Sequence, residues 1–133
     1  MTFVDASVLV AILTGEDDAA ELVRRLDAAS DPFTSPLAVF ETALGVFRKN
    51  RKPMDLVSEQ VAGLLSRANI RLVEITPAEA DLALAAFARY GKGQGHPAQF
   101  NMGDCFAYAA ARHHGAGLLF KGDDFAHTDI PVA

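Results

Sequence analysis

The sequence predicts an α/β fold in which helices cover both faces of a parallel sheet. Short apolar segments, such as Phe3-Val4 and Leu118–Phe120, alternate with longer segments whose apolar residues recur at helical spacing. This alternation is typical of parallel strands joined by helices that pack on the sheet. No internal repeat, low-complexity tract or linker divides the 133 residues, so we expect one domain over residues 1–133.

Strand and helix signals follow one another along the chain. Strands are expected at residues 3–4, 33–34, 71–75, 117–120 and, as a last edge strand, 130–132. Helices are expected at residues 6–13, 17–26, 36–52, 54–68, 77–90 and 101–114. Ser35 is the expected N-cap of the third helix, with Pro36 at its first position. Thr76 and Glu79 have the spacing of a capping box at the start of the fifth helix.

The third helix combines an apolar stripe with an acidic residue. Phe40, Leu44 and Phe47 recur at helical spacing and are expected to face the core. Glu41 lies about 100° around the helix from Phe40, at the edge of that stripe. Arg48, two turns further on, returns to the side of Glu41.

Composition excludes several classes of protein. Half of the residues are hydrophobic, which argues against a disordered chain. Cys105 is the single cysteine, so an internal disulfide is excluded, and the four histidines lack the spacing of a zinc site. No apolar run approaches the roughly 20 residues of a membrane span, and the first residues do not resemble a secretory signal. We therefore expect a cytoplasmic protein.

The net charge of −5 would ordinarily count against a nucleic-acid-binding protein. Acidic residues that hold a metal ion are neutralised when the ion is bound, however, and they would distort this sum. The net charge therefore neither supports nor excludes binding to nucleic acid.

Three aspartates stand where an apolar strand ends or a helix begins: Asp5, Asp104 and Asp124, the last directly after Asp123. In an open parallel sheet these positions meet at the edge where ligands bind. Two like charges about 4 Å apart repel by roughly 4 kcal/mol at an effective dielectric constant near 20, so such a cluster needs a cation. Mg²⁺ prefers oxygen ligands and suits phosphate chemistry. With Glu41 as a fourth candidate, the sequence predicts a metal-dependent phosphodiesterase.

Each acidic residue also has a simpler interpretation. Asp5 could be only a helix N-cap, Glu41 an ion-pair partner of Arg48, and Asp104 a charge that complements a helix dipole. The two aspartates after the strand at 117–120 could form an acidic turn, and only one of them can easily point toward the others. The shared position at the sheet edge favours a common site.

Other residues are weaker candidates. Ser7 could donate a hydrogen bond to Asp5, and the glycine-rich segment 91–95 lacks the spacing of a phosphate-binding loop but could lie near a substrate. Basic side chains could contact a phosphate backbone, although solvated charge is the commoner explanation. The candidate RNA-contacting residues are Ser7, Arg48, Lys92, Asn101 and Lys121.

The motifs together resemble those of PIN-domain ribonucleases, specifically the VapC-type toxins of type II toxin–antitoxin modules. The segments that carry the resemblance are 4–13, 35–41, 101–109 and 118–125. The resemblance implies a three-layer α/β/α sandwich with a parallel sheet of about five strands in the order 3-2-1-4-5. It also implies a homodimer, a cognate VapB-type antitoxin that inserts a segment into the acidic site, and an RNA substrate such as tRNA or rRNA.

By the same resemblance, Asp5, Glu41, Asp104 and Asp124 bind Mg²⁺ or Mn²⁺, and an activated water attacks the RNA phosphorus. Many PIN domains carry a Thr-x-Asp-x-Asp-Phe pattern near the last acid, whereas here Phe120 and Gly122 replace its first two conserved residues. This leaves open whether Asp123 or Asp124 is the ligand. A non-catalytic PIN-like binding module and a phosphatase or phosphotransfer domain are the alternatives, and the latter is disfavoured because Asp5-Ala6-Ser7 lacks a second aspartate.

Overall fold

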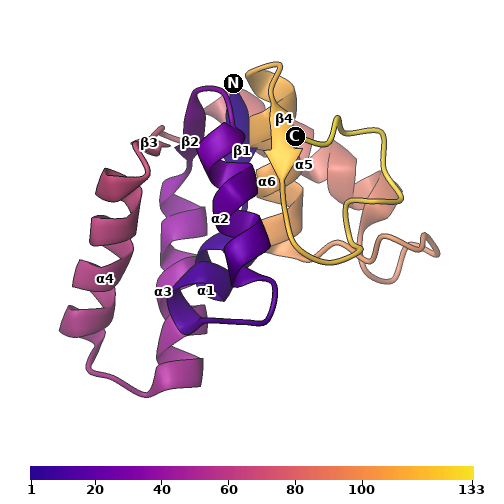
Figure 1. Cartoon of the computed structure of the whole chain (residues 1–133). Coiled ribbons are helices and arrows are strands. Elements are labelled where there is room, and N and C mark those ends of the chain that lie inside the picture. The colour runs from indigo at the N-terminus through magenta and orange to yellow at the C-terminus, as the bar shows by residue number, and fades with distance from the viewer.

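The computed structural model describes residues 1–133 as a parallel sheet between two layers of helices (Figure 1). The strands are β1 (Thr2–Val4), β2 (Pro32–Thr34), β3 (Arg71–Leu72) and β4 (Gly117–Leu119). The helices are α1 (Ala6–Thr14), α2 (Ala19–Ala28), α3 (Pro36–Asn50), α4 (Met54–Arg67), α5 (Pro77–Tyr90) and α6 (Met102–His113). The predicted fold class is confirmed. None of the helices is long and apolar enough to cross a membrane.

The sheet has four strands in the order β3-β2-β1-β4, all parallel, instead of about five. The expected last strand is reduced to one bridge between Leu118 and Val132. Leu118 N donates to Pro131 O at 2.9 Å, and Ala133 N donates to Leu118 O at 3.0 Å. Because Pro131 has no N–H to donate, it cannot extend a ladder of hydrogen bonds. The strand order expected from the resemblance is therefore confirmed for four strands, and the bridge at Val132 takes the place of the fifth strand beside β4.

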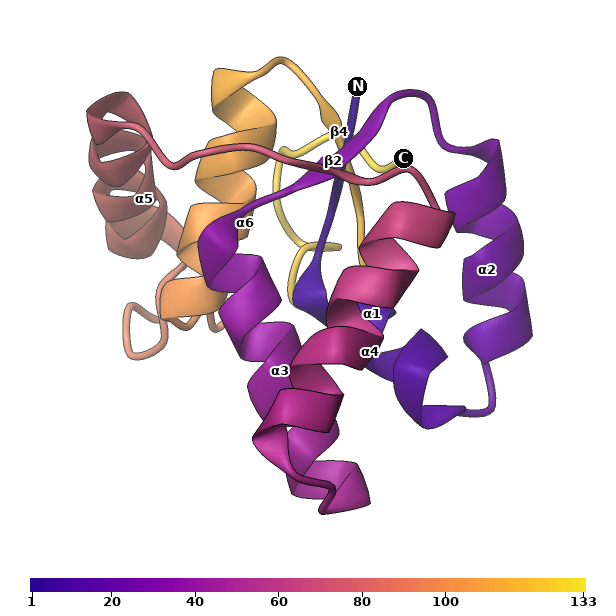
Figure 2. The ribbon, with the colours of Figure 1, turned by 90° about the vertical axis from the view of Figure 1, so that its left-hand side faces the viewer.

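Alternate residues of the central strands face opposite layers. Phe3 and Leu118 belong to a core formed with α5 and α6, whereas Val4 and Leu119 belong to a core formed with α1, α2 and α4. Figure 2 shows α5 and α6 on one side of the sheet and α2 and α4 on the other. Strands buried on both faces are typical of parallel sheets. This arrangement leaves the carboxyl ends of the strands free to position a site.

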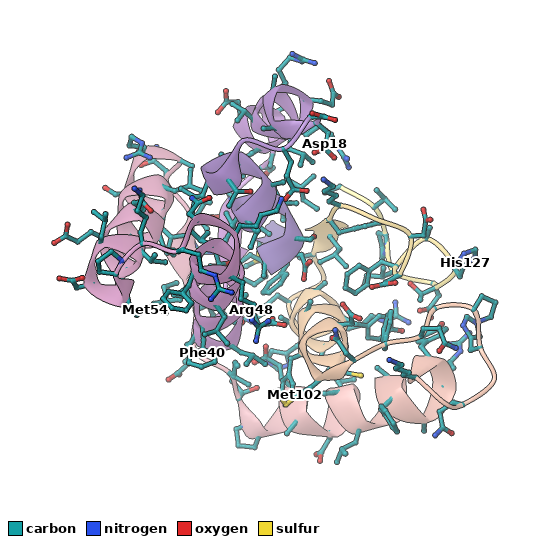
Figure 3. All side chains as sticks on the ribbon, turned by 90° about the horizontal axis from the view of Figure 1, so that it is seen from below. Asp18, Phe40, Arg48, Met54, Met102 and His127 are labelled. Atoms are coloured by element: carbon teal, nitrogen blue, oxygen red, sulfur yellow. The ribbon has the colours of Figure 1, made fainter.

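The expected core stripe on α3 is only partly confirmed: Phe47 packs against a small buried cluster that includes Val46, whereas Phe40 does not face the core. Phe40 is 61% exposed and lies at the surface in Figure 3. The buried face of α3 instead carries the small or short residues Ala38, Thr42 and Val46. The helices α1 and α3 pack too closely for larger side chains, since a Cβ added at Gly45 would lie 2.7 Å from a methyl group of Val10.

Candidate active site

Asp5 lies at the carboxyl end of β1, between the neighbouring strands. Its backbone N–H donates to Leu119 O at 3.0 Å, which fixes it beside the end of β4. As the N-cap of α1, its Oδ2 accepts hydrogen bonds from Ser7 N at 3.0 Å and Ser7 Oγ at 2.6 Å. The residue is only 7% exposed. Burial raises the pKa of Asp5, although the hydrogen bonds from Ser7 oppose this shift.

Asp104 occupies the third position of α6 and forms a capping box with Asn101. Asn101 N donates to Asp104 Oδ2 at 3.0 Å, and Asp104 N donates to Asn101 Oδ1 at 2.9 Å. Burial raises the pKa of Asp104 to about 7, with a further contribution from the charges of Asp5 and Asp124. Asn101 therefore orients this carboxylate through the box.

Glu41 enters the same site from the second turn of α3. Its pKa is raised to about 7, first by burial and then by the charges of Asp5 and Asp104. Its carboxylate lies directly against the backbone of Gly103, because a Cβ added there would stand 1.8 Å from Glu41 Oε2. Sequence reasoning missed Gly103. A glycine in the first turn of a helix, next to a candidate ligand, was the available signal.

Of the two aspartates after β4, Asp124 is the one coupled to the cluster. Gly122, at φ +100°, turns the chain directly before them. The charge of Asp124 contributes to the raised pKa of both Asp5 and Asp104, and Asp123 contributes to neither. The structure therefore brings together four carboxyl groups from four separate segments of the chain.

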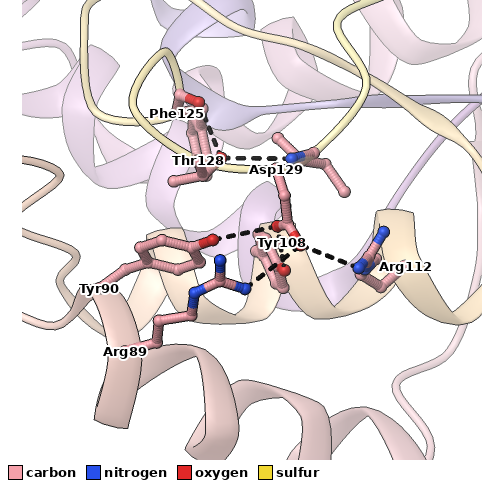
Figure 4. A network of polar contacts seen from close by, with 8 residues as sticks. Arg89, Tyr90, Tyr108, Arg112, Phe125, Thr128 and Asp129 are labelled. Atoms are coloured by element: carbon pink, nitrogen blue, oxygen red, sulfur yellow. Dashed lines mark hydrogen bonds and ion pairs between the residues drawn. The ribbon is translucent and has the colours of Figure 1, made fainter.

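A polar network holds the C-terminal segment that carries Asp124 (Figure 4). Tyr90 Oη and Tyr108 Oη donate to Asp129 Oδ1 at 3.1 and 2.5 Å. Arg89 and Arg112 pair with Asp129 Oδ2 at 3.3 and 3.0 Å. These bonds lower the pKa of Asp129, that from Tyr108 most, and burial raises the pKa of Tyr108 to about 12. The C-terminal segment is thus fixed to α5 and α6.

The basic candidates have different surroundings. The ammonium group of Lys121 pairs with Glu16 and, at 3.0 Å, with Asp18, while Lys121 N donates to Ser7 Oγ at 3.0 Å. Arg48 and Lys92 are exposed and form no ion pair. These two side chains are therefore free to meet an external anion, whereas Lys121 is engaged within the protein.

The donor set of the cluster fits a hard divalent cation. Carboxylate oxygens are the ligands that Mg²⁺ and Mn²⁺ prefer, and the pKa values near 7 show how strongly the isolated protein disfavours the charged forms. Three potential ligand atoms lie within 4.8 Å of one another in a different group, formed by Glu79, His113 and His114.

The chain is similar to several known proteins. The PIN domain family matches residues 2–131. The chain is 43% identical to a VapC ribonuclease of Rhizobium meliloti (strain 1021), over 98% of this chain and 99% of that protein. It is 38% identical to ribonuclease VapC42 of Mycobacterium tuberculosis (strain ATCC 25618 / H37Rv), over 98% of this chain and 97% of the relative.

Two solved structures share the fold. Mycobacterium tuberculosis VapC20, described as a sarcin-ricin loop cleaving toxin, matches with a TM-score of 0.80 and 17% identity, over 100% of this chain and 98% of that one. A chain of a toxin–antitoxin complex from Klebsiella pneumoniae matches with a TM-score of 0.74 and 18% identity, over 100% and 97% of the two chains.

Proposed function

Because the chain belongs to the PIN domain family and is related along its whole length to VapC ribonucleases, we propose that it is the toxin endoribonuclease of a toxin–antitoxin pair. The observation that carries this proposal is the convergence of Asp5, Glu41, Asp104 and Asp124 at one edge of the sheet. Structured RNA such as tRNA or rRNA in the cytoplasm is the proposed substrate. VapC20, which shares the fold, is itself described as cleaving the sarcin-ricin loop.

The four carboxylates would hold Mg²⁺ or Mn²⁺, which supplies Lewis acidity and lowers the pKa of a bound water. Ser7 and Asn101 fix the carboxylates of Asp5 and Asp104 by hydrogen bonds, so we assign both an orienting role. We further assign Glu41 the role of helping to accept the proton of the attacking water.

Arg48 and Lys92 are the proposed contacts to the phosphate backbone, since both are exposed and unpaired. Replacing either by Gln should weaken RNA binding and reduce its salt dependence. The ammonium group of Lys121, by contrast, is engaged by Glu16 and Asp18 and instead fixes the loop after α1.

The deciding experiment is cleavage of total RNA by the purified protein with Mg²⁺ or Mn²⁺ and with EDTA. Discrete cuts that require the metal and disappear in D5N, but remain in the exposed control D81N, would support the proposal and identify the RNA. A protein free of antitoxin that shows no metal-dependent cleavage would instead be a binding module or act on another phosphate substrate.

We further propose two protein partners. An antitoxin with a basic side chain complements the acidic cluster, and the toxin–antitoxin complex that shares this fold supports such a partner. A second copy of the chain would cover exposed apolar residues on α3, α5 and α6. These residues are Phe40, Leu84, Phe87 and Met102.

The homodimer can be tested with charged substitutions on this surface. We expect L84E and M102E to shift the protein from dimer to monomer in light scattering, because a charge cannot be buried there without a partner. E59Q, on the exposed face of α4, is the control that should leave the mass unchanged. A dimer that survives both charged substitutions would place the contact elsewhere.

A further inference from the structure

We propose that Glu79, His113 and His114 form a second metal site, for a divalent transition ion such as Zn²⁺. Each of the three offers a ligand atom, and these atoms all lie within 4.8 Å of one another. Glu79 stands in the first turn of α5, His113 is the last residue of α6, and His114 is the C-cap of α6. The histidines are adjacent in sequence, and the glutamate reaches them only through the packing of the two helices.

Glu79 is a buried carboxylate without a cationic partner. It is 2% exposed and takes part in no ion pair. Thr76 N and Thr76 Oγ1 donate to its Oε2 at 2.8 and 2.9 Å, and Oε1 accepts no hydrogen bond. Burying an unpaired carboxylate is costly, and a bound cation would compensate it. The hydrogen bonds from Thr76 also orient the carboxylate, as outer hydrogen bonds commonly orient metal ligands.

His114 provides an independent observation. Its Nε2 is the one buried side-chain nitrogen or oxygen in the chain without a hydrogen-bond partner. The ring packs edge-on against Phe33, with centroids 5.0 Å apart, and against His113, at 4.9 Å. Buried polar atoms are rarely left unpaired, so this nitrogen calls for a ligand. The C-terminal end of α6 also favours a positive charge at this position.

The donor set separates this site from the acidic cluster. Two imidazoles and one carboxylate are characteristic of Zn²⁺ and leave a fourth position for water, whereas Mg²⁺ prefers oxygen ligands. Atoms no more than 4.8 Å apart lie within about 2.8 Å of a common centre. Zinc ligands stand at about 2.0–2.2 Å, so shifts below about 1 Å would complete the coordination. The exposed side chain of His113 is free to make such a shift.

The site and the acidic cluster lie at opposite ends of α6. Asp104 is in the first turn of this 12-residue helix and His113 is at its end. At about 1.5 Å per residue, these positions are roughly 14 Å apart along the axis. A bound ion would join the start of α5 to the end of α6 and stabilise the layer that carries Asp104.

Zinc binding should be measured by titration calorimetry and thermal unfolding in the D104N background, which weakens competition from the acidic cluster. We expect one Zn²⁺ per chain, a rise in melting temperature with Zn²⁺ but not with Mg²⁺, and visible absorption bands when Co²⁺ replaces Zn²⁺. H113Q and E79Q should each weaken zinc binding at least about tenfold, since loss of a ligand should cost no less than loss of an outer hydrogen bond.

Suitable controls keep the test decisive. Gln at position 79 can still accept the hydrogen bonds from Thr76, and His113 is exposed, so both variants should fold. H127Q removes an exposed histidine elsewhere and should bind zinc normally. Absence of zinc binding in the D104N protein, or equal affinity in H113Q and H127Q, would overturn the proposal whether or not the protein cleaves RNA.

Discussion

Among single residues, Glu41 and Asp104 link protonation to stability. The pKa of each is about 7, because burial and neighbouring carboxylates disfavour the charged form. A carboxyl group whose pKa is higher in the folded than in the unfolded chain holds its proton more tightly when folded. Its contribution to the free energy of unfolding is therefore complete below about pH 4 and is lost as the pH rises through about 7.

We expect E41Q to reveal this penalty. In metal-free protein the variant should melt a few degrees above the unmodified chain at about pH 8, and the difference should shrink toward about pH 4.5. Thermal unfolding in EDTA measures both values. A difference that stays the same at the two pH values would contradict the coupling of Glu41 to its acidic neighbours.

Asp123 and Asp124 differ in their expected contribution to metal binding. Because Asp124, unlike Asp123, is coupled to Asp5 and Asp104, D124N should lower the cleavage rate by about a hundredfold or more, and D123N by less than about threefold. Single-turnover cleavage with Mn²⁺ compares the two. A greater loss in D123N would reverse the assignment.

At the level of helices and strands, the caps that begin a helix could be predicted from the sequence, whereas the side of α3 that faces the core could not. Ser35 caps α3 through a bond from Ala38 N at 3.1 Å, and Thr76 and Glu79 form the expected capping box, because capping depends on neighbours in sequence. Asp5 could likewise be placed at the end of β1, whereas the approach of Glu41 to it depends on how α3 packs. The exposure of Phe40 could not be predicted, because the close packing of α1 against α3 selects the inward face.

The helices α3 and α6 meet where the Glu41 carboxylate lies against Gly103. G103A should displace the Glu41 carboxylate, since the new Cβ would stand 1.8 Å from Oε2, and should reduce cleavage about tenfold or more while the helix content stays the same. G63A on α4 is the matched control, because its Cβ would approach only the flexible end of Arg67, at 3.0 Å. Full activity of G103A would show that Glu41 tolerates a different position.

For the whole molecule, the network around Asp129 connects the C-terminal segment to the α5–α6 layer. D129N removes the charge that pairs with Arg89 and Arg112. We expect its melting temperature to fall by a few degrees and its cleavage rate to fall as well, because Asp124 lies on the same segment. Thermal unfolding and cleavage assays on D129N, beside the exposed control D27N, check both effects. No change in either would mean that Asp124 is held by its own turn.

Neither this network nor the Glu79, His113 and His114 group was predictable from the sequence. Each unites residues from segments far apart in the chain, and no spacing rule describes them. The spacing of the four histidines gave no sign of a metal site, because the third member of the group, Glu79, lies in the first turn of another helix.

The placement of β1 between β2 and β4 determines when the protein can become active during its own synthesis. Thr2 pairs with Gly117, and Ser7 contacts Lys121, 114 residues later. Contacts so distant in sequence form late and slow the folding of a chain. A ribosome must therefore release nearly the whole polypeptide before Asp5 and Asp124 can meet. A partly synthesised chain would therefore lack the assembled acidic cluster.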